Sequence, residues 1–339
     1  MFQNIYSGKK ILVTGHTGTK GSWLSFWLHR MGAQVYGISH SPKPGPNHYE
    51  LLNLHGVLVK DIHADISLVE EITSIQPDLV MHLAARAIVS RAFLEPEYTM
   101  KCTVMGMVHL LELCRCCPSI KGIVAIETDK VYDNQEWDWG YREMDELGGD
   151  DPYSMSKVCV DQVIRCYRKS YGMNISATRS GNIIAGGDWN EKRLIPDIVK
   201  ATAKGESVEI HTPNATRPWL HILDTLRGYL LLGQKILQGE DVNSAFNFGP
   251  NDEMTVLDVL EKAKSVWPNV QYVVKEQETH KHMVQLLKID STKSNKLLGW
   301  KPLWTTEEAI ARTIEWYRAY FQEGEVLTDK QIEEFENGM

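Results

Sequence analysis

The sequence has no apolar run that approaches the roughly 20 residues needed to span a membrane. Its beginning has no apolar signal core, and no long basic tract offsets the net charge of -8. These absences argue against a membrane protein, a secreted protein and a protein that chiefly binds nucleic acid. We therefore expect a cytoplasmic protein with neither membrane nor nucleic acid as a partner.

Cysteine is present in six copies but not in the spacing of a zinc site. Cys114, Cys116 and Cys117 lie on one helix-like segment, with no Cys-x-x-Cys partner elsewhere in the chain. Tetrahedral zinc sites need such a second pair or equivalent histidines. We expect no metal site and interpret the cysteines as reduced thiols.

Length and periodicity define the expected architecture. The 339 residues can bury one large core, or a core and a smaller lobe. Strand and helix patterns alternate up to about residue 180, with strands expected at 10–14, 34–38, 58–62, 78–83, 122–127 and 174–179. This alternation predicts an α/β fold, a Rossmann-type doubly wound parallel sheet.

The second half of the chain changes in character. Loops rich in Gly, Pro and Trp appear after residue 180, and helices are expected at 195–203, 222–238, 255–266 and 305–321. We predict a dinucleotide-binding domain over 1–180. Residues 181–339 would form a smaller mixed α/β substrate lobe, with some chain crossing back to the sheet.

A glycine-rich turn near the start indicates a cofactor site. The strand before Gly15 leads into glycines at 15, 18 and 21, and a helix-period run begins at Trp23. Such a turn lets a pyrophosphate approach the backbone at the amino end of a helix. A plain β-turn-α corner is the structural alternative.

The choice of cofactor depends on the end of the second strand. Residues 39–43 offer neither the acid typical of NAD sites nor an Arg typical of NADP sites, and we favour NAD. Asp65 is expected to reach the adenine amine, or else to cap the next helix. The predicted cofactor-binding residues are Gly15, His16, Thr17, Gly18, Thr19, Lys20, Gly21, Asp65, Ile66, Ala84, Ala85, Tyr153 and Lys157.

The predicted catalytic residues come from two neighbouring segments. Thr128, Asp129 and Lys130 follow a buried strand, at the sheet edge where ligands bind. Tyr153 and Lys157 are spaced i, i+4 on one helix face. The ammonium of Lys157 is expected to lower the pKa of the Tyr153 phenol, which would make Tyr153 a base near neutral pH.

These motifs together resemble the extended short-chain dehydrogenase/reductase superfamily, and within it the CDP-glucose 4,6-dehydratases. The resemblance covers nearly the whole chain. It is carried by Gly15-His16-Thr17-Gly18, Asp129-Lys130-Val131-Tyr132-Asp133-Asn134, Trp137-Asp138-Trp139-Gly140-Tyr141-Arg142-Glu143, Gly187-Asp188-Trp189 and Arg217-Pro218-Trp219.

The resemblance implies an internal redox cycle that converts CDP-glucose, or a related nucleotide hexose, to a 4-keto-6-deoxy sugar. Tyr153 would take the 4-hydroxyl proton while hydride passes from C4 to NAD, and Thr128 would hydrogen-bond the 4-oxygen. Lys130 would remove the C5 proton and Asp129 would protonate the departing 6-hydroxyl. Hydride would then return to C6.

The same resemblance places Arg193 and Arg217 beside the diphosphate of a nucleotide sugar, where guanidinium groups suit phosphate oxygens. A surface salt bridge is the alternative role of each arginine. The predicted substrate-binding residues are Arg86, Asn182, Arg193, Leu194, Arg217 and His221.

Four positions depart from the family pattern. Arg86 stands where the family has Gln, and Thr103 stands where it has Asn. Glu127 stands in place of a Ser or Thr, and Met283 in place of the Glu of a His-Glu-Ala segment. Arg86 and Glu127 place charge at strand ends that face the expected site. Because an unpaired buried charge is costly, we expect the two to pair with each other or to meet a charged substrate.

Two other functions stay open. A nucleotide-sugar epimerase or reductase of the same superfamily would not need the Asp129-Lys130 pair, and a catalytically silent dinucleotide-binding protein would not need Tyr153 and Lys157.

Helices near 104–117 and 154–170 are apolar on more than one side, which favours a homodimer, with a tetramer or simple burial against the sheet as alternatives.

Overall fold

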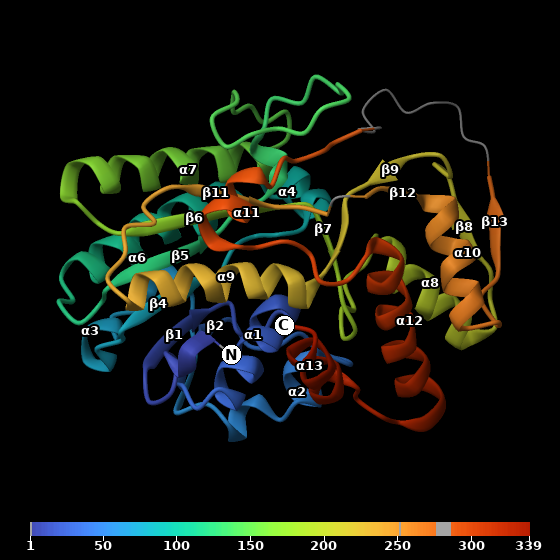
Figure 1. The fold of residues 1–339 in the computed structure, drawn as a ribbon, viewed down its shortest axis with the longest axis horizontal. Helices are drawn as coiled ribbons and strands as arrows, with labels where there is room; N and C mark the ends of the chain where they lie inside the picture. Colours follow the sequence, from blue (N-terminus) through green and yellow to red (C-terminus); the bar gives the residue numbers. More distant parts are fainter. Residues whose placement is uncertain (1, 251, 276–285) are drawn as a thin grey trace.

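A seven-stranded parallel sheet forms the centre of the molecule (Figure 1), in a computed structural model that describes residues 2–250, 252–275 and 286–339. The strand order is β11-β6-β5-β4-β1-β2-β3. The strands are β1 (Lys10–Thr14), β2 (Gln34–Ser39), β3 (Lys60–His63), β4 (Leu79–His82), β5 (Gly122–Ile126), β6 (Ile175–Ser180) and β11 (Ala245–Phe248). The predicted doubly wound sheet is confirmed, and its direction of growth reverses between β1 and β4, where such folds bind ligands.

Helices cover both faces of the sheet because its central strands are apolar on both sides. Val13 belongs to the core under α1 (Thr19–Arg30) and α9 (Ile222–Leu237). Its neighbour Leu12 belongs to the core under α6 (Gly106–Arg115) and α7 (Pro152–Tyr171). Figure 1 shows α7 and α9 on opposite sides of the strands. This double burial explains the continuous apolar runs in the sequence.

The second half of the chain builds a lobe at the carboxyl edge of the sheet (Figure 1). It contains α8 (Leu194–Lys204), α10 (Val256–Val266), α12 (Thr306–Glu323) and the strand pairs β7 (Asn182–Ile184) with β10 (Trp219–His221), β8 (Val208–Ile210) with β13 (Tyr272–Val274), and β9 (Thr216–Arg217) with β12 (Met254–Thr255). Between these elements α9 and β11 return to the central sheet. The four helices expected here all form, within two residues of their predicted ends, while the division at residue 180 stays a prediction.

Short elements complete the chain. They are η1 (Phe2–Asn4), η2 (Leu54–Gly56), η3 (Ile66–Leu68), η4 (Lys101–Met105), η5 (Asp129–Val131), α2 (His48–Leu51), α3 (Ile72–Ile75), α4 (Val89–Leu94), α5 (Pro96–Met100), α11 (Thr292–Leu298) and α13 (Thr328–Asn337). Among the described helices, none combines the length and apolar character needed to cross a bilayer.

The two ends of the chain are fastened together. The buried ring of His48 lies 2.7 Å from the Ser22 hydroxyl of α1 through Nδ1 and 2.7 Å from the Thr328 hydroxyl of α13 through Nε2. Burial lowers the pKa of His48 to about 3, so the ring is neutral when it makes these bonds. The Trp27 indole also donates to Glu336 at 2.7 Å. The last helix is therefore part of the first β-α unit.

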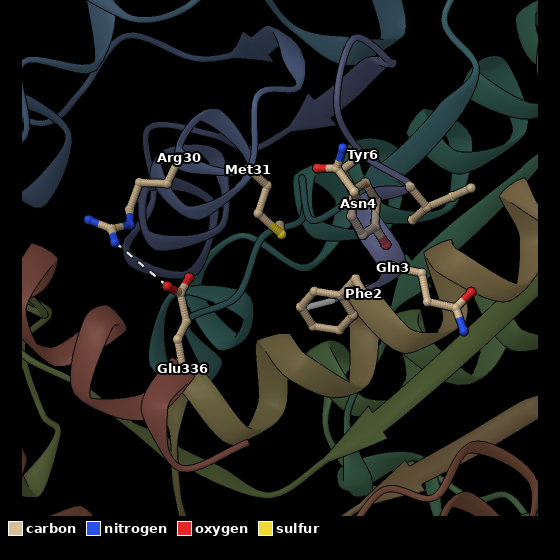
Figure 2. A pocket seen from close by; sticks show the side chains of 8 residues that line it. Phe2, Gln3, Asn4, Tyr6, Arg30, Met31 and Glu336 are labelled. Carbon is tan, nitrogen blue, oxygen red and sulfur yellow. Dashed lines mark ion pairs between the residues drawn. The ribbon is translucent and has the colours of Figure 1, made fainter.

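A cavity of about 470 Å³ opens against the N-terminal turn (Figure 2). Phe2 and Met31 line it with apolar surface, and the ion pair between Arg30 and Glu336 closes one side at 3.6 Å. None of the predicted site residues lines this cavity. The predicted catalytic residues lie elsewhere, at the carboxyl edge of the sheet.

Candidate active site

The carboxyl end of β5 holds three of the predicted catalytic residues. The Thr128 hydroxyl caps η5 by accepting from the Lys130 backbone N–H at 3.3 Å, and it donates to the Asp129 carboxylate at 3.1 Å. Thr128 and Asp129 are buried, and Lys130 is exposed. One short turn therefore holds a fixed hydroxyl, a buried acid and an accessible ammonium.

The first turns of α7 bring the other two residues to the same place. The Asp151 carboxylate caps the helix by accepting from the backbone N–H groups of Tyr153 at 2.8 Å and Ser154 at 3.0 Å. Lys157 follows one turn later, and its ammonium donates to the Ile126 carbonyl at the end of β5 at 3.0 Å. This contact fixes α7 against the catalytic turn.

The charge state of Tyr153 differs from our expectation. We predicted that Lys157 would lower the pKa of the phenol, but the pKa of Tyr153 is raised, chiefly by burial. The nearby carboxylates of Glu127 and Asp129 raise it as well, and the Thr128 side chain lowers it. The Lys157 ammonium lies 3.3 Å from the Glu127 carboxylate, so the positive charge of Lys157 is partly neutralised by Glu127.

The Asp129 carboxyl is tuned toward proton exchange. Burial raises its pKa to about 6, against the opposing effects of Lys130, Thr128 and Lys20. A carboxyl group with a pKa near neutrality can both give and take a proton. Asp129 therefore has the properties of a general acid.

The glycine-rich turn has the shape of a dinucleotide cradle. Gly15 adopts φ +77°, and a Cβ at this position would lie 2.8 Å from the Ala84 backbone nitrogen. A Cβ at Gly21 would lie 2.2 Å from the Gly15 carbonyl, so α1 packs directly on the turn. Gly18 precedes α1 without a side-chain cap. These residues fit a pyrophosphate, because the backbone is bare where phosphates would approach.

Cations gather beside this turn. Lys20 is half-buried, and its pKa is lowered to about 8 by burial and by the charges of Arg193 and Lys157. The charges of Arg193 and Lys157 both oppose the charge of Lys20, so this group of cations indicates a site that accepts an anion.

His16 has a different place from its neighbours in the turn. Its side chain is fully buried and contacts Asp61 at 2.7 Å through Nε2. His63 lies 3.0 Å from the same oxygen of Asp61, and the Tyr49 hydroxyl donates to the other oxygen. One imidazole nitrogen each of His16 and His63 and one Asp61 oxygen have the spacing of metal ligands, yet these atoms already contact one another as hydrogen-bond partners. Only the backbone of His16 can face a cofactor.

The remaining predicted cofactor residues surround the same edge. The Asp65 carboxylate caps η3 by accepting from the Ser67 N–H at 2.9 Å, so the capping alternative is observed and the adenine contact stays a prediction. Ile66 is in the core under α6. Thr17 bonds Ser39 at 2.8 Å, whereas Thr19, Ala84 and Ala85 are half-buried beside the turn.

Two arginines of the lobe reach toward the catalytic turn. Arg193 precedes α8, lies 3.3 Å from the Asp188 carboxylate and acts electrostatically on Tyr153 and Lys20. Arg217 donates to the Thr216 carbonyl at 2.7 Å, and Asp129 and Glu136 act on its charge. The structure therefore brings both arginines to the edge that holds Asp129.

Asn182, Leu194 and His221 differ in exposure. Asn182 and Leu194 are half-buried beside the arginines. His221 is fully buried, caps α9 by accepting from the Leu223 N–H at 3.3 Å, and contacts the Trp304 ring at 4.6 Å between centroids. This position gives His221 a structural role, and its contact with a substrate stays a prediction.

Arg86 does not pair with Glu127, so that alternative is wrong, while contact of Arg86 with a charged substrate stays a prediction. The guanidinium of Arg86 pairs with Glu95 and lies over the Tyr98 ring, 5.2 Å from its centroid. The buried hydroxyl of Thr103 accepts from the Arg86 backbone N–H at 3.4 Å. The sequence could not separate these partners, because the choice depends on the fold: Glu95 lies between α4 and α5 within reach of Arg86, while Glu127 contacts Lys157. Met283 is outside the described residues.

Asp188 was not predicted as a site residue. It is 7% exposed and holds Arg193, and its carboxylate also accepts from the Asn190 backbone at 3.1 Å. Its place in the Gly187-Asp188-Trp189 segment was the only signal in the sequence.

Comparison with known proteins supports the family predicted from the motifs. The family model for GDP-mannose 4,6 dehydratase matches residues 12–313. A CDP-glucose 4,6-dehydratase of Salmonella typhimurium is 38% identical over 96% of this chain and 95% of its own length. A dTDP-glucose 4,6-dehydratase of the same organism is 31% identical over 77% of this chain and 79% of its own length.

Solved structures show the same fold. A dTDP-glucose 4,6-dehydratase of Bacillus anthracis in complex with NAD has a TM-score of 0.77 at 23% identity, covering 94% of this chain and 98% of its own. A UDP-glucose 4-epimerase of Thermotoga maritima has a TM-score of 0.81 at 24% identity, covering 92% of this chain and all of its own. With the glycine turn, the Thr-Asp-Lys turn and the Tyr-x-x-x-Lys helix at one sheet edge, the chain belongs to the nucleotide-sugar 4,6-dehydratase family of the extended short-chain dehydrogenases/reductases.

Proposed function

We propose that this protein is an NAD-dependent CDP-hexose 4,6-dehydratase, with CDP-glucose as its first candidate substrate. The observation that carries the proposal is the Asp129-Lys130 pair beside Tyr153, in a chain 38% identical over nearly its whole length to a CDP-glucose 4,6-dehydratase. A simple epimerase would not need an acid and a base at C5 and C6. The product would be the CDP-linked 4-keto-6-deoxy sugar.

Each residue of the site has a separate step in the proposed reaction, according to its position. When bound, NAD supplies the acceptor and donor of hydride. Tyr153 takes the proton of the sugar 4-hydroxyl, and Thr128 orients the 4-oxygen from the next turn. Lys130, which is exposed at the edge of the site, removes the C5 proton, and the buried Asp129 protonates the leaving 6-hydroxyl.

Two arginines of the lobe bind the diphosphate part of the substrate. Arg193 and Arg217 bind the diphosphate, because guanidinium groups form paired hydrogen bonds with phosphate oxygens. Asn182 and Leu194 border the same opening from β7 and α8. The α1 amino end and Lys20 remain for the phosphates of the cofactor.

A panel of CDP-, UDP-, GDP- and dTDP-sugars tests this function. We expect alkali-stable 4-keto absorbance with CDP-glucose and no net NADH. Accumulation of NADH in proportion to sugar would indicate an ordinary dehydrogenase instead. A changed 4-configuration without a keto group would indicate an epimerase.

Two variants test the elimination step. In Lys130→Ala and Asp129→Asn the oxidation at C4 should persist while dehydration slows by roughly a hundredfold to ten-thousandfold. Deuterium exchange at C5 should be lost in Lys130→Ala and retained in Asp129→Asn. Lys235→Ala, in a surface ion pair with Glu240, serves as the control. Normal C5 exchange in Lys130→Ala would remove Lys130 from the reaction.

A homodimer is part of the proposal. Phe93, Leu94, Tyr98 and Met105 are 61%, 78%, 40% and 55% exposed, and they lie on α4, α5 and η4, which pack against α7. So much apolar surface on neighbouring helices is typical of an interface.

Light scattering at micromolar concentration checks the assembly. We expect a dimer that Met105→Glu dissociates, whereas Met144→Glu, at a residue 94% exposed in a turn outside these helices, should leave the mass unchanged. A wild-type monomer would contradict the proposed interface.

Cytoplasmic location and a role in polysaccharide biosynthesis complete the proposal. All six cysteines are free thiols in the structure, which suits a reducing compartment. Fractionation of cells that express the tagged full chain would test the location.

A further inference from the structure

A buried carboxylate lies directly beneath the catalytic turn. Glu127 directly follows β5 with 3% of its surface exposed, and its Oε1 lies 3.3 Å from the Lys157 ammonium. Its Oε2 is buried and has no hydrogen-bond partner among the described residues. Buried carboxylates with an unsatisfied oxygen are costly when ionised. Glu127 is therefore poised between its neutral and its charged form.

The elements around Glu127 present charges of both signs. On α7, Lys157 favours the ionised carboxylate and Asp161 opposes it, while Arg179 on β6 favours it. The Tyr229 phenol of α9 lies within range of the same charge. Burial outweighs these effects and raises the pKa of Glu127 to about 7.

Other titratable groups lie close enough to Lys157 and Tyr153 to interact with them electrostatically. His82 on β4 and Lys20 on α1 lie close enough to Lys157 for its charge to lower their pKa values. Asp129 of η5 raises the pKa of Tyr153, and Arg193, before α8, lowers it.

The ionised Glu127 acts on Tyr153 in two ways. Its negative charge raises the pKa of the phenol directly. It also holds the Lys157 ammonium at the end of β5, where this cation neutralises Glu127 rather than a developing tyrosinate. Protonation of Glu127 removes its negative charge from the surroundings of the phenol. The positive charge of Lys157 is then no longer neutralised by Glu127 and can stabilise a developing tyrosinate.

We propose that Glu127 is a positioning residue that sets the pH range in which Tyr153 accepts the sugar proton, by controlling how much of the Lys157 charge reaches the phenol. This inference rests on the proposed dehydratase function. It concerns the oxidation at C4 and leaves the roles of Asp129 and Lys130 unchanged.

Glu127→Gln and Glu127→Asp separate charge from shape. The Gln amide oxygen can still accept from Lys157, so a merely structural role would leave the pH profile of kcat/KM unchanged. We expect instead that Glu127→Gln moves the acid limb of C4 oxidation to lower pH by about one pH unit, the effect of one nearby charge. Glu127→Asp, which keeps the charge, should retain the wild-type limb, and Glu240→Gln is the surface control.

Infrared difference spectroscopy gives a readout that needs no substrate. In wild type labelled with ¹³C at the side-chain carboxyl of glutamate, an isotope-shifted carboxylic acid C=O band should disappear as the pH rises through about 7, and Glu127→Gln should lack it. The bands of Asp129 and Asp224, whose pKa values burial raises to about 6 and about 7, stay unshifted and do not interfere. Absence of this band in the wild type would overturn the inference even if the Gln variant failed to fold.

The failure of the inference is distinct from the failure of the proposed function. If wild-type protein forms 4-keto product but Glu127→Gln keeps the wild-type acid limb, the inference fails alone. If no nucleotide sugar yields a 4-keto product, the proposed function fails and takes the kinetic role of Glu127 with it.

Discussion

Two buried ion pairs attach α7 to neighbouring strands, and they are built differently. Asp161 of α7 meets Arg179 of β6 through two guanidinium nitrogens, at 3.0 Å and 2.8 Å. Arg179 also donates to the Tyr132 hydroxyl at 3.1 Å and lies over the Tyr132 ring. Lys157 of α7 meets Glu127 after β5 by a single contact of 3.3 Å.

The difference separates a structural pair from an adjustable one. In the pair between Asp161 and Arg179, several hydrogen bonds compensate the removal of both charges from water. In the pair between Glu127 and Lys157, one carboxylate oxygen is left unsatisfied and the pKa of the acid rises to about 7. Of the two pairs, the second acts on Tyr153, the residue that we propose to accept the sugar proton.

The largest effect should come from removing the phenol that the adjustable pair serves. Tyr153→Phe should lower the rate of 4-keto formation by roughly a hundredfold to ten-thousandfold, because the proton acceptor is lost. The melting temperature should hardly change. Tyr171→Phe, at a residue 54% exposed at the far end of α7, is the control for rate and melting temperature.

Breaking the structural pair should cost stability instead of chemistry. Arg179→Met leaves Asp161 buried without its partner, and we expect a loss of about 3–5 kcal/mol in the free energy of unfolding. Urea denaturation measures it. Arg115→Met breaks an exposed pair with Glu112 and should cost less than about 1 kcal/mol. Equal losses in the two variants would contradict the distinction between the pairs.

The adjustable pair should appear in the pH dependence of stability. The pKa of Glu127 is raised in the folded state, so its stabilising contribution is present below the ordinary pKa near 4.5 and is lost as the pH rises through about 7. The free energy of unfolding of Glu127→Gln, taken relative to that of the wild type, should therefore rise by about 2 kcal/mol from pH 5 to pH 8. Urea denaturation at both pH values checks the sign. A larger gain at pH 5 would contradict the raised pKa.

The smallest effect is expected at Arg86, which belongs to neither pair. Its ion pair with Glu95 is partly exposed, so Arg86→Gln should change the free energy of unfolding by less than about 1 kcal/mol. The melting temperature and the KM for CDP-glucose are measured together. A change in KM alone would restore the substrate role that we predicted for Arg86.

The fold could be predicted where local pattern and tertiary packing agree. The fully apolar run of β5 and the helix-period run of α1 each need burial that only a layered α/β sheet provides. β11 was not predicted. Its four residues, Ala-Phe-Asn-Phe, become a strand only because β6 lies beside them, and this pairing spans some seventy residues of chain.

The site was predictable as a set of residues but not as a set of partners. Thr128, Asp129 and Lys130 follow from their place after a strand. The partner of Lys157 depends on which carboxylate its flexible side chain reaches, and sequence spacing does not fix that choice. For His221, the same residue type suits both a helix cap and a ligand contact, and only the packing around it decides.

The bridge through His48 has a consequence for folding of the chain. Phe2 and Trp27 share one hydrophobic core with Ile332 and Phe335, and the His48 ring joins the same two ends by hydrogen bonds. The first β-α unit therefore cannot complete its packing until α13 is available to it. Because native contacts of such wide sequence separation form late in folding, the face of α1 that carries Trp23 and Trp27 stays uncovered until α13 packs on it.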